Sequence, residues 1–170
     1  MEQKLEAYRR KRNFLKTSEP SGKEEKPVGV TKRKIFAVQL HYARTTHFDF
    51  RLEWDGVLLS WAVPKGPSFN PKDKRLAVRV EEHPLDYADF EGVIPKGEYG
   101  GGTVLLWDKG YWTETEDFAR GLEKGSLKLR LDGKRLKGGW ALVRLNDKDK
   151  AEDEKENWLL FKEKDSFAKD

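Results

Sequence analysis

The chain has 170 residues, enough for one domain with a single core of ordinary size. Its 34 basic and 30 acidic side chains nearly balance, which is typical of a soluble protein and is only weak support for a nucleic-acid partner. The absence of cysteine excludes a disulfide framework, a thiolate nucleophile and a cysteine-based zinc site.

The N-terminal fifth of the chain is basic, with 11 basic and 5 acidic side chains in residues 1–35. The stretch LEAYRRKRNF predicts a short helix, and TSEPSGKEEKP predicts an extended linker. Residues 1–33 are therefore expected to form a basic arm and linker, which either faces an anionic partner or is a solvated tail. With no apolar run long enough for a signal peptide or a bilayer span, we expect a cytoplasmic protein without a membrane partner.

From Lys34 onward the pattern changes to period two. Short β-branched and aromatic runs predict eight strands, at residues 34–41, 46–54, 57–63, 75–83, 103–108, 126–131, 137–145 and 157–162. Asp55-Gly56 predicts a tight hairpin, residues 116–124 a helical turn or two, and residues 147–157 an exposed loop. The domain at residues 34–165, followed by a tail at 166–170, is therefore expected to be mostly β, as an antiparallel barrel or a sandwich.

All three histidines fall on polar faces of these predicted strands. Alternation places Gln39 and His41 on the polar face of the first strand, and puts His47, Asp49 and Arg51 together on that of the second. In the fourth strand the apolar set is Leu76, Val78 and Val80, and the polar set is Arg75, Arg79, Glu81 and His83. If the three strands are neighbours, one surface collects His41, His47, His83, Asp49, Arg51 and Glu81.

Two imidazoles and one carboxylate within nine positions, His41, His47 and Asp49, suit a transition metal with open positions for water and substrate. Cations expected near them suit phosphate, namely Arg51, Lys65, Arg75 and Arg79. The combination predicts metal-assisted phosphoryl chemistry. A polar β surface with scattered charges remains the alternative, because His-x-Asp is a common sequence.

The other conspicuous residues have simpler explanations. Trp61 and Trp140 lie in apolar strand contexts and are expected to pack in the core rather than to stack on bases, as are Phe48 and Phe50. The run Gly100-Gly101-Gly102 is similar to a phosphate-cradling loop, but no helix follows it, so we interpret it as a turn between strands.

Two stretches, HYARTTHFDFRLEWDGVLLSWAVPKGPS and RLAVRVEEHPLDYADFEGVIPKGEYGGGTVLLWDKG, resemble the 3′-phosphoesterase domain of bacterial DNA ligase D and its free-standing archaeal relatives. The likeness extends to KRNFLKTSEPSG and to the strand at 138–140. It implies a compact antiparallel β-barrel that acts as a free-standing enzyme. The implied activity removes a terminal ribonucleoside from a primer strand, and then the 3′-phosphate left behind, in the repair of double-strand breaks by end joining.

The same resemblance implies a metal and its ligands. Mn²⁺ is the implied ion, with Co²⁺ or Zn²⁺ as substitutes, and His41, His47 and Asp49 are the implied ligands. Arg51 and His83 are implied to grip the scissile phosphate, and His83 is alternatively the general acid. The implied partners are primer-template DNA ending in a 3′-ribonucleotide or a 3′-phosphate and a separate DNA ligase and polymerase, and we expect a monomer.

Other positions that the family uses are also present. Lys65 and Glu81 are assigned to the catalytic group, with Glu81 expected to orient a histidine rather than to bind metal. The implied substrate-binding residues beside Arg51 and His83 are Arg12, Glu19, Gln39, Arg75 and Tyr87. One departure is Asn13, where the family usually carries aspartate. If that carboxylate orients a histidine or a water at the metal, its loss changes the balance of the two reactions, and Glu19 is a candidate to compensate.

Two rival functions stay open on the sequence: a non-catalytic nucleic-acid-binding module and a metal-dependent phosphatase for small molecules. Binding alone would not need the His41, His47 and Asp49 cluster, and a small-molecule phosphatase would not need a basic arm.

Overall fold

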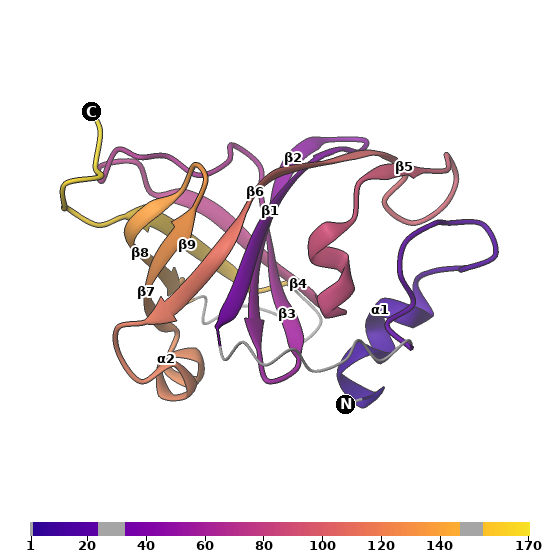
Figure 1. Ribbon diagram of the computed structural model, residues 1–170, viewed down its shortest axis with the longest axis horizontal. Coiled ribbons are helices and arrows are strands. Elements are labelled where there is room, and N and C mark those ends of the chain that lie inside the picture. The colour runs from indigo at the N-terminus through magenta and orange to yellow at the C-terminus, as the bar shows by residue number, and fades with distance from the viewer. Residues whose placement is uncertain (1, 24–32, 147–154) are drawn as a thin grey trace.

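The computed structural model describes residues 2–23, 33–146 and 155–170, and it is mostly strand (Figure 1). In chain order the elements are η1 (Glu2–Leu5), α1 (Glu6–Arg10), β1 (Lys34–Tyr42), β2 (Thr46–Trp54), β3 (Val57–Val63), β4 (Arg75–His83), η2 (Leu85–Asp89), β5 (Gly92–Ile94), β6 (Gly102–Glu114), α2 (Phe118–Lys124), β7 (Ser126–Gly133), β8 (Lys137–Arg144) and β9 (Asn157–Lys162). None of the described helices has the length and apolar character needed to span a membrane.

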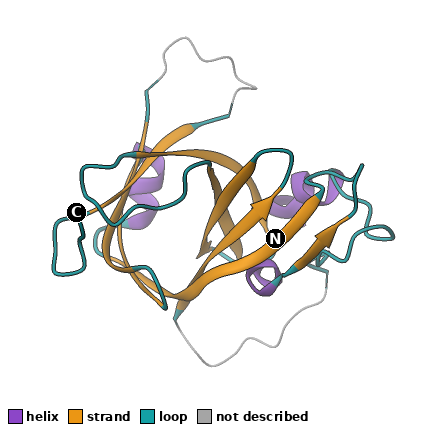
Figure 2. Ribbon diagram, turned by 90° about the horizontal axis from the view of Figure 1, so that it is seen from above, coloured by secondary structure: helices purple, strands orange, loops and turns teal. Residues whose placement is uncertain are grey.

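Eight strands close into an antiparallel barrel, so the predicted barrel is confirmed. The order around it is β1-β2-β3-β4-β9-β8-β7-β6, and β6 pairs again with β1 to close the ring (Figure 2). β6 is 13 residues long, and this length lets it pair with β1 throughout while β7 joins it at one end and β5 at the other. The short β5 therefore lies outside the ring.

Alternate strand residues fill the barrel interior. Phe36, Val38, Phe50 and Leu52 point inward from β1 and β2, and the largest buried side chains in the described part of the chain include Trp61, Trp112, Trp140 and Trp158. The expected core packing of Trp61 and Trp140 is confirmed, since both are fully buried. The interior is a packed core, which leaves no room there for a substrate.

The local signals for turns and the second helix are confirmed. Asp55 and Gly56 both have positive φ, as a tight two-residue hairpin requires, and they connect β2 to β3. The Asp117 side chain accepts a hydrogen bond from the backbone N–H of Arg120 at the start of α2, and Gly125 ends that helix in the left-handed conformation. Residues 24–27 of the predicted linker and residues 147–154 of the predicted loop lie outside the described residues.

The face assignment for β4 is wrong. Val80 pairs with Ser60, and His83 pairs with Leu58. Three steps along β4 therefore match two steps along β3, and the extra residue of β4 forms a β-bulge near Glu81. Before the bulge, the odd-numbered residues of β4 lie on the same face of the sheet as Trp61, which packs in the core. Ala77 is accordingly buried, whereas Leu76 is exposed. The bulge returns His83 to the opposite face, on which Ser60 and Leu58 lie.

A second apolar layer covers the outer face of β1 and β3. Ala37 and Leu58 contribute from the strands, and Tyr87 and Ala88 from η2, with Tyr8 of α1 packed against them. Figure 1 shows α1 and the short helix after β4 beside this wall of the barrel rather than inside it. His83 at the end of β4 lies on this side of the wall, next to Arg12 of the N-terminal arm, defined here as residues 2–23.

The half-buried and the fully buried phenylalanine of β2 give different stability predictions. Phe50 has no exposed surface, and we expect Phe50→Ala to lower the free energy of unfolding by about 3–5 kcal/mol because it leaves a cavity between β2 and β3. Phe48 is partly exposed and contacts Trp107, so Phe48→Ala should cost less. Urea unfolding of both variants measures this, and equal losses would contradict the assignment of Phe50 to the centre of the core.

Candidate active site

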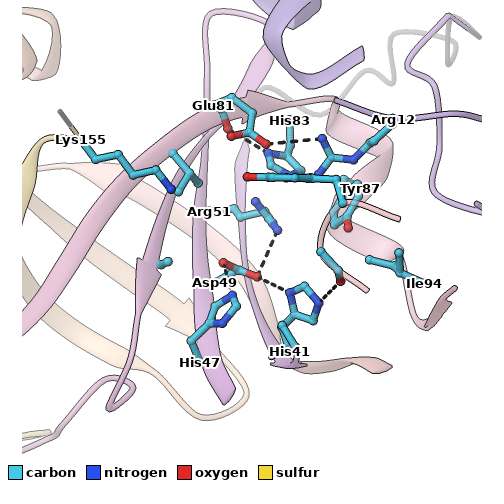
Figure 3. A pocket seen from close by; sticks show the side chains of 15 residues that line it. Arg12, His41, His47, Asp49, Arg51, Glu81, His83, Tyr87, Ile94 and Lys155 are labelled. Atoms are coloured by element: carbon cyan, nitrogen blue, oxygen red, sulfur yellow. Dashed lines mark hydrogen bonds and ion pairs between the residues drawn. The ribbon is translucent and has the colours of Figure 1, made fainter. Parts of the chain in front are cut away.

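The pairing of β1 and β2 brings the candidate metal ligands together. His41 lies directly opposite His47, and Gln39 lies opposite Asp49. One ligand atom from each of His41, His47 and Asp49 lies within 4.8 Å of the others, while His41 Nδ1 is 3.5 Å from Asp49 Oδ2 and His47 Nε2 is 3.3 Å from Asp49 Oδ1. The expected juxtaposition of these three side chains is present in the structure (Figure 3).

In each imidazole, the nitrogen that faces away from Asp49 is hydrogen-bonded to a backbone carbonyl. His41 Nε2 is 2.6 Å from the carbonyl oxygen of Gly100, and His47 Nδ1 is 2.9 Å from that of Thr45. A carbonyl oxygen only accepts, so each of these nitrogens carries the proton. In the neutral rings the inner nitrogens then present lone pairs toward the Asp49 carboxylate, and this arrangement needs a cation or a proton between them. The residues thus fit a divalent ion of the kind that imidazole and carboxylate bind.

Arg51 is held rigidly beside this cluster. Its Nε donates to Gln39 Oε1 at 2.7 Å and its Nη1 donates to Ser60 Oγ at 2.9 Å, while its Nη2 lies 3.5 Å from Asp49 Oδ2. The guanidinium also packs over the ring of Tyr87, with 4.7 Å between the guanidinium carbon and the ring centroid. A planar fork fixed in this way presents its remaining donors in one direction, which suits a phosphate.

The N-terminal arm brings a second arginine to the same place. Arg12 Nε donates to Glu19 Oε2 at 2.9 Å, and its Nη1 lies 3.4 Å from Glu81 Oε1. Glu19 is buried, and it also accepts hydrogen bonds from the hydroxyls of Tyr87 and Thr17. The buried carboxylate of Glu19 therefore ties the arm to η2 and fixes Arg12 at the site.

His83 reaches the site through the bulge in β4. Its Nδ1 donates to the backbone carbonyl of Glu81 at 2.9 Å, and its Nε2 lies 3.4 Å from Arg12 Nη2, which leaves Nε2 as the acceptor. Burial lowers the pKa of His83 well below its usual range, and the charges of Arg51 and Arg12 lower it further. In the free protein His83 is neutral.

These groups line one pocket of about 260 Å³. In Figure 3, His41, His47 and Asp49 lie at one end, Glu81, His83 and Arg12 lie at the other, and Arg51 lies between them. Of the predicted site residues, the ones that line the pocket are Arg12, His41, His47, Asp49, Arg51, Glu81, His83 and Tyr87.

Four predicted residues lie outside this lining. Lys65 and Arg75 line a different groove, because Lys65 follows the end of β3 and Arg75 precedes the bulge of β4. Gln39 is fully buried and holds Arg51 while donating to the carbonyls of Tyr87 and Phe90. Gln39 and Glu19 therefore position pocket residues from behind and are not exposed to a substrate.

The structure also shows what Glu81 and Asn13 contact. The Glu81 carboxylate pairs with Lys11 and Arg12 of the arm, and it is the Glu81 backbone carbonyl that orients His83. The Asn13 side chain is exposed, and its Oδ1 accepts a hydrogen bond from the backbone N–H of Leu15. Asn13 thus shapes a turn of the arm and does not reach the metal ligands.

The structure adds site residues that the sequence reasoning missed. The carbonyl of Gly100 fixes His41, and Tyr99 and Lys155 also line the pocket. Ser60 Oγ accepts a hydrogen bond from Arg51 and donates one to the backbone carbonyl of Leu58. A backbone carbonyl has no sequence signature, but the exposed tyrosine next to the glycine run at 100–102 could have been noted.

Comparison with known proteins agrees with this site. Residues 39–144 match the family model described as the DNA Ligase D 3′-phosphoesterase domain. The chain belongs to this family. The match begins at Gln39 and spans the strands that carry His41, His47, Asp49, Arg51 and His83, so the cluster is part of the family's domain.

Relatives of known sequence carry the same domain in longer chains. The chain is 52% identical over 165 residues to the multifunctional non-homologous end joining protein LigD of Pseudomonas aeruginosa, a match that covers 97% of this chain and 19% of that protein. It is 46% identical over 143 residues to LigD of Mycobacterium tuberculosis, covering 84% of this chain and 18% of the relative. The chain thus spans about a fifth of the length of the curated relatives it matches.

Metal binding at this site is expected to compete with a proton on His47. Burial alone would lower the pKa of His47, but the hydrogen bond and charge of Asp49 outweigh it, and the pKa is raised above 6.5. His47 then holds a proton at pH values where an ordinary imidazole is neutral. As pH is lowered, the affinity for a divalent ion is therefore expected to begin falling above pH 6.5. Mn²⁺ titrations between about pH 8 and pH 6 measure this, and a constant affinity would contradict it.

Proposed function

We propose that this domain is a Mn²⁺-dependent hydrolase of 3′ ends, which removes a terminal ribonucleoside from a primer strand and then the remaining 3′-phosphate. The family supports phosphoester hydrolysis in general, and the relatives' names refer to non-homologous end joining. The two-step activity, the metal and the DNA substrate are the parts that we propose.

The observation that carries the proposal is the pair of imidazoles whose outer nitrogens are bonded to the carbonyls of Gly100 and Thr45. This arrangement aims two lone pairs and the carboxylate of Asp49 at one point, which nucleic-acid binding alone does not require. An ion bound there would supply Lewis acidity toward a phosphoryl oxygen. The buried guanidinium groups of Arg51 and Arg12 lie along the same pocket and would neutralise the charge of a phosphate.

His83 would change its protonation when substrate enters. In the free protein Nε2 has no proton, because burial and two guanidinium groups oppose a third charge. The negative charge of a phosphate between Arg51 and Arg12, one for the diester and about two for the 3′-phosphate, offsets those charges and favours a proton on Nε2, which would then donate to a phosphate oxygen. In hydrolysis of the diester, the bond from phosphorus to the 5′ oxygen of the terminal nucleoside breaks, that oxygen takes up a proton, and water supplies the new oxygen on phosphorus.

A primer-template assay tests the function. One primer ends in a single ribonucleotide and another in a 3′-phosphate, and each is incubated with protein and Mn²⁺, Co²⁺, Zn²⁺ or a chelator. The expected result is loss of the ribonucleoside, appearance of the 3′-phosphate and then of the 3′-hydroxyl, with no reaction in chelator. Tight binding of the primer-template without hydrolysis in any of the metals would instead favour a binding module, and cleavage of small phosphate esters alone would favour a general phosphatase.

A further inference from the structure

Tyr99 is an exposed aromatic residue at the mouth of the pocket. Its side chain lines the pocket although 42% of the residue is exposed, whereas the other tyrosine in the lining, Tyr87, is 2% exposed. It lies on the loop between β5 and β6, where Glu98 N–H donates to the Pro95 carbonyl and Gly101 N–H donates to the Glu98 carbonyl. These two turns hold the loop, and the next residue, Gly100, contacts the metal-ligand cluster through His41.

Two cations of the arm lie beside the Tyr99 ring. Lys11 Nζ is 4.9 Å from the ring centroid and the guanidinium carbon of Arg12 is 5.2 Å from it. The Lys11 ammonium also lies 3.5 Å from the Tyr99 hydroxyl. These contacts hold the partly exposed Tyr99 ring in place at the pocket.

The pocket is too small to enclose a whole nucleotide. Its volume of about 260 Å³ is below the about 300–1,000 Å³ of pockets that enclose drug-sized ligands. Arg51, His83 and Asp49 are the most buried of the charged residues and histidines that line it, at 3%, 3% and 6% exposed, and the phosphate would bind beside them. The sugar and base of the terminal nucleoside would then extend to the mouth, where the Tyr99 ring lies.

We propose that Tyr99 stacks on the base of the terminal nucleoside that leaves the strand, and so determines specificity for ribonucleoside removal over phosphate removal. This inference rests on the proposed function. An aromatic ring stacks on every base because each base has a π face, so the contact favours a nucleoside without selecting among the four bases. A primer that ends in a 3′-phosphate has no base beyond the phosphate and makes no such contact.

The test compares Tyr99→Ala and Tyr99→Phe on three primers: one ending in a ribonucleotide, one ending in a ribose that lacks its base, and one ending in a 3′-phosphate. For Tyr99→Ala we expect kcat/KM for ribonucleoside removal to fall by about 5- to 100-fold, mainly through a higher KM and similarly for all four bases. On the base-less primer, kcat/KM of the unaltered protein should already be reduced by this factor, and Tyr99→Ala should reduce it little further. Tyr99→Phe keeps the ring and should preserve the preference for a base.

Tyr111→Ala is the matched control, because Tyr111 is an exposed tyrosine on β6 that lines another groove and packs against Arg33. It should change none of the three rates. An equal loss of ribonucleoside and phosphate removal in Tyr99→Ala would overturn the inference, since the ring would then act only by holding Lys11 and Arg12. The inference would also be overturned if loss of the base lowered kcat/KM as much in Tyr99→Ala as in the unaltered protein. If the unaltered protein hydrolyses neither primer, the proposed function itself fails.

Discussion

Asp49→Asn is expected to abolish hydrolysis and Mn²⁺ binding together. Asp49 is buried between both imidazoles and Arg51 and would supply the only negative charge among the three ligands. The loss should exceed the about 10–100-fold reduction that follows removal of an outer hydrogen-bond partner of a metal ligand. The new amide can donate to the lone pair of His41 or His47, so the fold should remain intact. Steady-state rates and calorimetric titration with Mn²⁺ measure the two effects.

The matched control for this variant is Asp55→Asn. Asp55 is exposed in the turn between β2 and β3 at positive φ, a conformation that asparagine also adopts. Its carboxylate pairs with Lys4, and it follows the end of β2 opposite to the one that carries His47 and Asp49. Full hydrolysis by Asp49→Asn with its far-UV spectrum unchanged would show that the carboxylate is not needed.

Arg51→Lys should reduce both reactions by about 10²–10³-fold, even though it keeps the charge. The guanidinium uses Nε and Nη1 to bind Gln39 and Ser60, and only a fork of this shape can do so while Nη2 faces the pocket. A lysine ammonium would leave Gln39 Oε1 or Ser60 Oγ without its donor. Because the phosphate is present in both reactions, ribonucleoside and phosphate removal should fall in parallel.

Arg120→Lys serves as the control, because Arg120 is exposed on α2, away from the pocket lining. Its rates should match those of the unaltered protein. A loss in Arg51→Lys confined to ribonucleoside removal would show that Arg51 contacts the leaving nucleoside rather than the phosphate.

The strand pattern predicted the barrel and the metal-ligand cluster because both depend on alternation in long, regular strands. In β2, three apolar residues alternate with His47, Asp49 and Arg51. The pairing of β1 with β2 then places His41 opposite His47. β5 has only three residues and is too short for alternation to show. The bulge in β4 likewise has no pattern of its own: it keeps His83 on the expected face but leaves Arg75 and Arg79 on the opposite one.

The supporting residues were harder to predict because they act through contacts between distant parts of the chain. Glu19 and Tyr87 lie 68 residues apart and meet only when the arm folds over η2. Sequence reasoning placed Gln39 and Glu19 near the substrate, but the structure buries both behind Arg51 and Arg12. The roles of Gly100 and Thr45 rest on main-chain oxygens, which any residue supplies.

The most direct measurement follows bound Mn²⁺ and hydrolysis in the same samples. Metal-free protein is titrated with Mn²⁺, the free ion is quantified by electron paramagnetic resonance, and single-turnover removal of a terminal ribonucleoside is measured at each point. We predict one tightly bound ion per chain, a rate that rises in proportion to its occupancy, and neither effect in Asp49→Asn. Hydrolysis at full rate in the metal-free protein, or a fully occupied site with no hydrolysis, would contradict the account.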